Sequence, residues 1–299
     1  NAPQVASGRL PPRALGISAP VSNVVEIRLS APTPELLQLL ALPDATVRRS
    51  GSAAPVNGAF LPDTGDTAAP GQLRFKRNAD FHGADSVKLG ALNLTATPDP
   101  TAAVARFTRA AADVVVGGGI GSLGEVRTLT KPASLHVEPV RGVYGYVANV
   151  RSGPLADVRV RTALAMAIDR EALVRRLFTT DDVPPLAGLL PDTLVAAPVQ
   201  PGWSQLSFEE RLATASALLA DAGYGPDRSL VLTLRLPAGR GHAMVAAAVA
   251  ADWLALGVET KLLVEPEAAH ARAVARSNFD VAVVERASPV DTPWALLAP

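Results

Sequence analysis

The sequence contains no cysteine in its 299 residues, and aromatic residues make up only 4% of the chain. Without thiols, cysteine catalysis, thiolate metal sites and internal disulfides are excluded. Lys and Arg together number 28, as do Asp and Glu, so the formal net charge is zero. This balance gives no electrostatic reason to expect nucleic acid or an anionic membrane surface as a partner.

No run of 18 apolar residues occurs in the chain, so a membrane-spanning helix is not expected. The first residues, NAPQVASGRLPPR, lack the basic start and the apolar stretch of a signal peptide. We therefore expect an export signal, and any cysteine that carries a lipid anchor, to lie upstream of this sequence. Contact with a membrane would then occur only through such an anchor.

The second half of the chain alternates strand-like and helix-like segments, which indicates an α/β architecture. Local signals mark the helix ends: Asp157 and Asp169 are helix caps, Ser207 and Glu210 form a capping box, and Gly223 stands where a terminating glycine belongs. The expected elements are helices over 157–169, 169–177, 207–222, 242–256 and 266–276, and strands over 230–236, 258–264 and 279–284.

The first half is less regular. Residues 1–22 are rich in Pro, Ala and Ser and are predicted to form an extended arm or linker. Thr33 precedes Pro34 and is predicted to cap a short helix. The other expected elements are strands over 24–29, 73–77, 87–94 and 113–116, and a helix over 100–112.

A literal G-x-G-x-x-G motif, Gly119 to Gly124, follows the apolar run that begins at Asp113. A dinucleotide site also needs a long helix after the third glycine and a carboxylate about twenty residues further on. Lys131-Pro132 limits any such helix to about two turns. Glu138 has nearly the required spacing but lies in a strand-like run. The glycines are therefore interpreted as a connection rather than as a nucleotide site.

No enzymatic constellation is present. The four histidines (His82, His136, His242 and His270) have no metal-ligand spacing, and no G-x-S-x-G motif occurs. We therefore predict no catalytic residues, no metal site and no cofactor. The functional classes that remain are a binding protein and an interaction module.

A family resemblance begins at Tyr144 and extends to Val174. The stretch YGYVANVRSGPLADVRVRTALAMAIDREALV resembles the signature of the family 5 extracellular solute-binding proteins, the peptide and nickel receptors of ABC importers. Further stretches resemble the family in the same order, among them residues 77–81, 98–105, 217–224 and 279–280. The resemblance covers roughly residues 23–299.

The resemblance implies an α/β, periplasmic-binding-protein-like type II fold, with two lobes of mixed sheets and flanking helices around a ligand cleft. It implies that residues 23–143 form part of the first lobe and the hinge crossover, and that residues 144–299 form a second lobe that is incomplete at its C-terminus. Family members are much longer, so this chain is expected to lack part of the first lobe.

The resemblance also suggests residues that line the cleft. In peptide receptors of the family, a carboxylate binds the peptide ammonium, and it follows the strand that corresponds to residues 279–284 here. In this sequence Pro289 occupies the position of that carboxylate. Asp291 lies nearby and is the expected substitute. The predicted cleft residues are Asp291, Glu285, Arg286, Trp294, Tyr144, Tyr146 and Asn149, and an ordinary loop or strand core is the alternative interpretation for each of them.

Two functional hypotheses follow. The departures from the family pattern and the low aromatic content favour a non-enzymatic, extracytoplasmic lipoprotein of the cell envelope. One mycobacterial lipoprotein with this fold regulates lipoarabinomannan and phosphatidylinositol mannoside synthesis. The resemblance therefore suggests a regulatory role in envelope glycolipid synthesis for this protein, with an envelope protein as partner. The alternative is the substrate-binding subunit of an ABC importer, with a peptide or other small solute between the lobes and an ABC permease as partner.

Overall fold

The computed structural model describes residues 1–45, 57–63, 69–97, 99–117, 134–136, 140–177, 185–293 and 296. The chain divides into two compact units, Asn1–Val47 with Pro289–Thr292, and Arg48–Ser288 with Pro293–Pro299. Each unit is described by itself.

The N-terminal unit contains α1 (Ala2–Ala6), β1 (Ile17–Val21), β2 (Val24–Ile27) and α2 (Leu36–Leu40). The expectation of an extended arm or linker over residues 1–22 is wrong for Ala2–Ala6, which form the helix α1. Strand β1 is extended but is part of a hairpin, because it pairs antiparallel with β2 and places Ile17 opposite Ile27. The predicted cap at Thr33 is also wrong. Its hydroxyl donates to the carbonyl of Ala31 at 3.2 Å, and α2 begins only after Glu35.

A three-stranded antiparallel sheet belongs to the second unit. Its order is β3 (Phe60–Pro62), β4 (Gln72–Arg77) and β5 (Ala91–Thr95). The strand predicted over residues 87–94 begins only at Ala91, because the preceding residues belong to the loop before β5. The helix α3 (Pro100–Thr108) follows and ends before the predicted Ala112, and the carboxylate of Asp99 caps it by accepting the N–H of Thr101 at 3.0 Å.

The strand predicted over residues 113–116 does not form. Val114 and Val116 are 70% and 83% exposed, and these residues pair with no strand of the described chain. An apolar run becomes a strand only when a neighbouring strand accepts its backbone hydrogen bonds.

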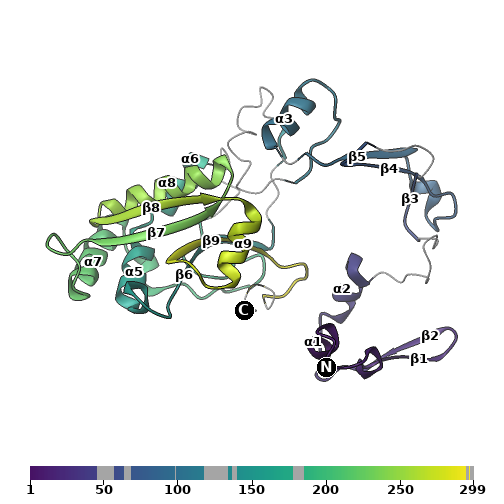
Figure 1. Ribbon diagram of the computed structural model, residues 1–299, viewed down its shortest axis with the longest axis horizontal. Coiled ribbons are helices and arrows are strands. Elements are labelled where there is room, and N and C mark those ends of the chain that lie inside the picture. The colour runs from purple at the N-terminus through teal and green to yellow at the C-terminus, as the bar shows by residue number, and fades with distance from the viewer. Residues whose placement is uncertain are drawn as a thin grey trace. The chain divides into compact units, whose positions relative to one another are not determined.

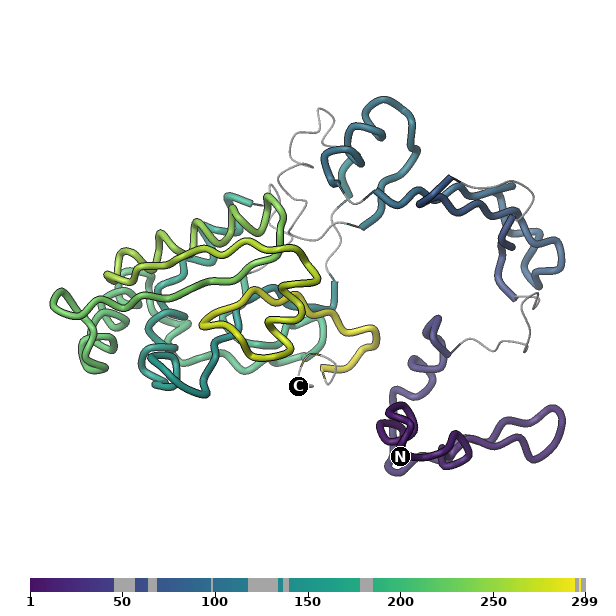
Figure 2. The backbone as a smooth tube through the Cα atoms, viewed as in Figure 1, coloured from purple at the N-terminus to yellow at the C-terminus, as the bar shows by residue number. Residues whose placement is uncertain are grey.

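The larger sheet of the second unit has four strands in the order β6 (Gly142–Ala148), β9 (Val281–Ala287), β7 (Leu230–Pro237) and β8 (Val258–Glu265). Strand β7 is parallel to both of its neighbours, whereas β6 is antiparallel to β9 (Figure 1). Figure 2 traces the chain from β7 through α8 to β8, and back through α9 to β9. This mixed sheet confirms the predicted α/β architecture.

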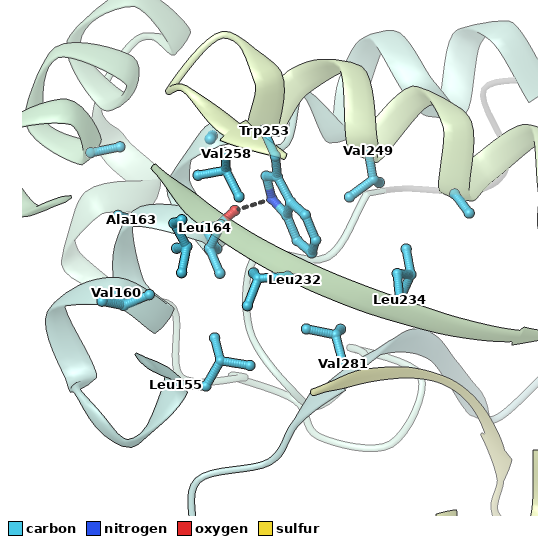
Figure 3. Packing of buried hydrophobic residues seen from close by; sticks show 14 of the residues in the cluster. Leu155, Val160, Ala163, Leu164, Leu232, Leu234, Val249, Trp253, Val258 and Val281 are labelled. Atoms are coloured by element: carbon cyan, nitrogen blue, oxygen red, sulfur yellow. Dashed lines mark hydrogen bonds between the residues drawn. The ribbon is translucent and has the colours of Figure 1, made fainter. Parts of the chain in front are cut away.

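The described helices that follow β6 in the chain are α5 (Val158–Ala167), α6 (Arg170–Leu177), α7 (Phe208–Asp221), α8 (Arg240–Leu254) and α9 (Glu267–Ala275). Alternate leucines of β7 are buried in one hydrophobic core with residues of α5, α7 and α8, so this side is called the α8 face of the sheet. The leucines are Leu230, Leu232, Leu234 and Leu236. Trp253 lies in this core, and its indole N–H donates to the carbonyl of Leu164 at 3.0 Å (Figure 3).

The helix ends follow the local signals in the sequence. The carboxylate of Asp157 accepts the N–H of Arg159 at 2.8 Å, and that of Asp169 accepts the N–H of Ala172 at 2.9 Å. Ser207 and Glu210 form the predicted reciprocal capping box. Gly223 has a φ of 84°, which is the left-handed conformation expected of a glycine just past a helix end.

Candidate functional site

The connections that follow three parallel strands meet at one edge of the four-stranded sheet. The last residues of β7 and β8, Pro237 and Glu265, are register partners, and the last residue of β9, Ala287, lies opposite the first residue of β6, Gly142. Strand β7 lies between β8 and β9 in the sheet. The chain passes from β7 to β8, its neighbour on one side, and then to β9, its neighbour on the other side. Such a switch point, at the carboxyl ends of parallel strands, is where open α/β sheets bind ligands. We call it the carboxyl edge.

Two aromatic rings from distant parts of the sequence meet at this edge. His242 lies in the first turn of α8, and Tyr144 lies near the start of β6. Their rings stack with centroids 5.8 Å apart and planes at 11°, and the phenol oxygen lies 3.3 Å from His242 Nδ1. His242 is only 6% exposed. The pair joins the N-terminus of α8 to the strand β6.

The protonation states of this pair follow from burial. Burial lowers the pKa of His242 below its ordinary value, against the opposing pull of the Glu285 and Glu267 carboxylates. Burial also raises the pKa of Tyr144, and the negative charges that Tyr146 and Glu285 would carry add to that rise. At neutral pH the phenol therefore keeps its proton and the imidazole is uncharged, so the phenol can donate to Nδ1.

Glu285 brings a negative charge to the carboxyl edge. It is the cross-strand partner of Tyr144, and its side chain is exposed. Cross-strand partners place their Cβ atoms about 4.5–5.5 Å apart on the same face. Glu267, in the first turn of α9, is also exposed. The edge thus combines accessible carboxylate charge with a buried, uncharged aromatic pair, which suits a ligand that carries a positive group.

The opposite face of the sheet has a buried polar network at the end of β8. Arg235 Nη1 lies 2.9 Å from Glu265 Oε2, and His270 Nδ1 lies 3.3 Å from Glu265 Oε1. The other ring nitrogen of His270 lies 2.8 Å from the carbonyl of Val283. Each side chain of this network has a partner within the fold. The network therefore fixes the turn between β8 and α9 on the face of the sheet opposite the α8 face.

The structure brings some of the predicted cleft residues together. Tyr144 and Glu285 are direct neighbours across β6 and β9. Tyr146 is on the same face but deeper, with its ring centroid 6.3 Å from that of Trp253. Arg286 lies on the other face of β9, and its Nη1 donates to the carbonyl of Leu296 at 3.2 Å.

Other predicted residues lie elsewhere. Asn149 is at the far end of β6, where its Nδ2 donates to the carbonyl of Ser277 at 3.1 Å. Asp291 belongs to the N-terminal unit, where its backbone N–H donates to Gln38 Oε1 at 2.7 Å. Trp294 and the motif Gly119 to Gly124 lie outside the described residues.

Sequence reasoning missed His242 and Glu267. In the sequence, His242 has no metal-ligand spacing and Glu267 belongs to no motif. One signal was available, because both residues follow directly after strands and stand at the start of helices, which is the position where α/β sheets bind ligands. In the described part of the chain, no group of three His, Asp or Glu side chains could hold a metal ion.

None of the described helices combines the length and apolar character needed to cross a membrane.

Comparison with protein families gives a match over nearly the whole chain. Residues 2–299 match the model described as bacterial extracellular solute-binding proteins, family 5 middle. The periplasmic murein peptide-binding protein MppA of Escherichia coli is 28% identical over 299 residues, which cover 94% of this chain and 54% of that protein. The periplasmic oligopeptide-binding protein OppA of Salmonella typhimurium is 26% identical over 275 residues, which cover 88% of this chain and 50% of that protein.

Solved structures give the same result. The structure of the E. coli murein tripeptide binding protein MppA superposes with a TM-score of 0.77 at 26% identity, covering 99% of this chain and 60% of that chain. The OppA structure from Burkholderia pseudomallei has a TM-score of 0.76 at 22% identity, and it supports the fold alone. These likenesses confirm the predicted periplasmic-binding-protein-like fold. The chain spans about half the length of the curated relatives it matches.

Proposed function

The chain belongs to the family 5 bacterial extracellular solute-binding proteins, and from this premise we propose that it is the substrate-binding part of an ABC importer that captures peptides. The names of its relatives support this proposal, because MppA and OppA are peptide-binding proteins. Both the family and these relatives are named for binding rather than for catalysis, in agreement with a sequence that has no enzymatic constellation.

The observation that carries the proposal is the placement of the Glu285 carboxylate beside Tyr144 at the carboxyl edge. A peptide presents a terminal ammonium, which must keep a carboxylate partner when it is taken out of water. Glu285 is accessible, and it is the cross-strand neighbour of the Tyr144–His242 pair. We assign the ammonium to Glu285, and the apolar parts of the ligand to the rim of this aromatic pair.

The proposal includes the wider setting of the protein. Residues 23–143 contribute to a first lobe and hinge crossover, residues 144–299 contribute to a second lobe, and the ligand is held between the two. The protein acts outside the cytoplasm and delivers its ligand to an ABC permease. Because MppA binds a murein peptide, peptides from the cell wall belong among the ligands to be tested.

The other hypothesis, regulation of envelope glycolipid synthesis by a lipoprotein, rests on departures from the family pattern such as Pro289. The relatives described above are peptide-binding proteins, and no contact in the described residues favours the regulatory role. Peptide capture is therefore the function put forward.

Native mass spectrometry of the purified protein tests the proposal. The protein is measured as isolated and after incubation with a pool of tripeptides to pentapeptides that includes murein peptides. A retained or acquired mass that matches a peptide is the expected result, and the mass identifies the peptide class. A spectrum that shows only the free protein in both samples would count against peptide capture.

A further inference from the structure

A cavity of about 360 Å³ lies on the α8 face of the sheet, between β6 and the helices α5, α6 and α8. All of its lining residues fall between Tyr144 and Val281, within one compact unit. Figure 3 labels five of these residues among the packed side chains of the core: Leu155, Leu164, Val249, Trp253 and Val281. The volume lies within the range of about 300–1,000 Å³ that is usual for small-molecule sites.

The walls of the cavity are mainly apolar and are held in place by the core. Val245 and Val249 of α8 are 2% and 1% exposed, and Trp253 is 2% exposed. The indole N–H of Trp253 is already bonded to the carbonyl of Leu164, which fixes the ring against α5. A ligand would therefore meet a preformed apolar surface, and little side-chain entropy would be lost when it binds.

Two arginines are among the residues that line the cavity, Arg161 in α5 and Arg170 in α6. Arg161 Nη1 donates to the carbonyls of Leu155 and Ala156 at 2.8 and 2.9 Å. Arg170 Nη1 donates to the carbonyl of Ala165 at 2.7 Å, and its guanidinium lies 5.4 Å from the ring centroid of Trp203. Among the described residues, neither arginine has a carboxylate oxygen within 4.0 Å of its guanidinium nitrogens.

The surroundings of Arg170 raise the energy of its charged form. Burial, together with the nearby charge of Arg211, lowers the pKa of Arg170 to about 10. The side chain stays cationic at neutral pH, and a carboxylate beside it would offset both effects. Tyr146 is a further lining residue of the cavity, and its phenol oxygen is buried.

We propose that this cavity is a second ligand site that binds an amphipathic monocarboxylate, such as a medium-chain fatty acid. The carboxylate lies at Arg161 and Arg170, and the apolar body lies against Val249 and Trp253. A cation is excluded by the two guanidinium groups, and an uncharged molecule of the same length lacks the charge-assisted hydrogen bonds. The cavity shares Tyr144 with the carboxyl edge, but the carboxylate is assigned to residues of α5 and α6, so this proposal does not depend on peptide capture.

Isothermal titration calorimetry with three ten-carbon probes tests the proposal: decanoate, decanol and decylamine, each below the concentration at which it aggregates. Decanoate is expected to bind at one site. Decanol should bind about tenfold or more weakly, because it lacks the charge-assisted hydrogen bonds, and decylamine should not bind. Equal binding of the three probes, or no binding of decanoate, would overturn the proposal.

Variants locate the site. Arg170→Gln and Arg161→Gln are each expected to weaken decanoate binding about tenfold or more, whereas the exposed Arg272→Gln on α9 serves as the matched control and should leave it unchanged. Ala165→Leu adds bulk to the cavity wall and should abolish binding. Circular dichroism checks each fold, and if Arg170→Gln unfolds, the other two variants decide the matter.

Wild-type affinity for decanoate in Ala165→Leu would place the site elsewhere. Displacement of decanoate by a bound peptide would show that the two ligands share one site, and it would overturn the claim of a second site. Full decanoate binding in a protein that binds no peptide would support the cavity site while contradicting the proposed function.

Discussion

Tyr144 and His242 are 98 residues apart in the sequence, yet the phenol oxygen of one lies 3.3 Å from Nδ1 of the other, and their rings stack at 11°. This contact joins the antiparallel edge strand β6 to the first turn of α8, and it lies where the parallel strands end. The described structure thus places a buried aromatic pair beside the accessible charge of Glu285.

The hydrogen bond of this pair can be tested with Tyr144→Phe, which keeps the aromatic ring stacked on His242 and removes only the hydroxyl group. We expect the free energy of unfolding to fall by about 1 kcal/mol, the usual net contribution of one such bond. Urea unfolding followed by tryptophan fluorescence measures the change. Tyr224→Phe, at a tyrosine whose ring lies under Arg228, is the matched control, and an equal loss in both variants would contradict the account.

His242 should make the stability depend on pH. Burial lowers its pKa in the folded state below the value of 6.5 that an exposed ring has, so between these two values the unfolded state binds more protons than the folded state. The contribution of His242 to the free energy of unfolding is therefore complete above about pH 7. This contribution is lost as the pH falls through 6.5 towards the pKa of His242 in the folded state. Urea unfolding at pH 7.5 and 5.5 measures it.

The variant His242→Gln cannot titrate, so it should lose less stability between pH 7.5 and 5.5 than the wild type. His136→Gln, at an exposed histidine, should keep the wild-type dependence. An unchanged pH dependence in His242→Gln would show that other groups control it.

The capping box at the start of α7 should contribute measurably to stability. Ser207 Oγ accepts the N–H of Glu210 at 3.3 Å, and the Glu210 carboxylate in turn accepts the N–H of Ser207 at 2.8 Å. Ser207→Ala is expected to lower the free energy of unfolding by about 1 kcal/mol. Ser204→Ala is the control, because the hydroxyl of Ser204 has only a 3.5 Å contact with Gln205. A negligible effect of Ser207→Ala in urea unfolding would contradict the assignment.

The elements of the second half could be predicted because their signals are local. Asp157 and Ser207 each bond a backbone N–H within three residues, and Gly223 ends α7 by its own conformation. In the first half the signals were weaker. Strand β1 depends on pairing with β2, and the apolar run 113–116 pairs with no described strand, so local composition misled in both places.

The site was predictable only in part. Tyr144 falls within a stretch that resembles the family, and Glu285 follows another such stretch, residues 279–280. The resemblance says nothing of His242, whose importance arises from contact with a strand 98 residues away. Asn149 appeared equivalent to Tyr144 in the sequence because both follow the same strand pattern. In the fold they stand at opposite ends of β6, a distinction that requires the strand order and direction.

Glu285→Gln should weaken peptide binding. The substitution preserves the shape of the side chain and removes the charge, so a peptide ammonium would lose a charge-assisted hydrogen bond worth about 1.5–3 kcal/mol. That loss corresponds to roughly 10–100-fold weaker binding. Glu259→Gln is the control, because Glu259 is exposed on β8 and lies 3.9 Å from Lys261. Titration calorimetry with a peptide from the native mass spectrum compares the variants, and equal affinities would remove Glu285 from the site.

The central claim is that the protein captures a peptide by its terminal ammonium, and calorimetry with one tripeptide in two forms tests it most directly. The two forms differ at the N-terminus, where acetylation replaces the ammonium with an uncharged amide. The account predicts that the free form binds and that acetylation weakens binding about tenfold or more. Equal binding of the two forms would contradict the ammonium site, and binding of neither form, nor of any peptide in the pool, would contradict peptide capture itself.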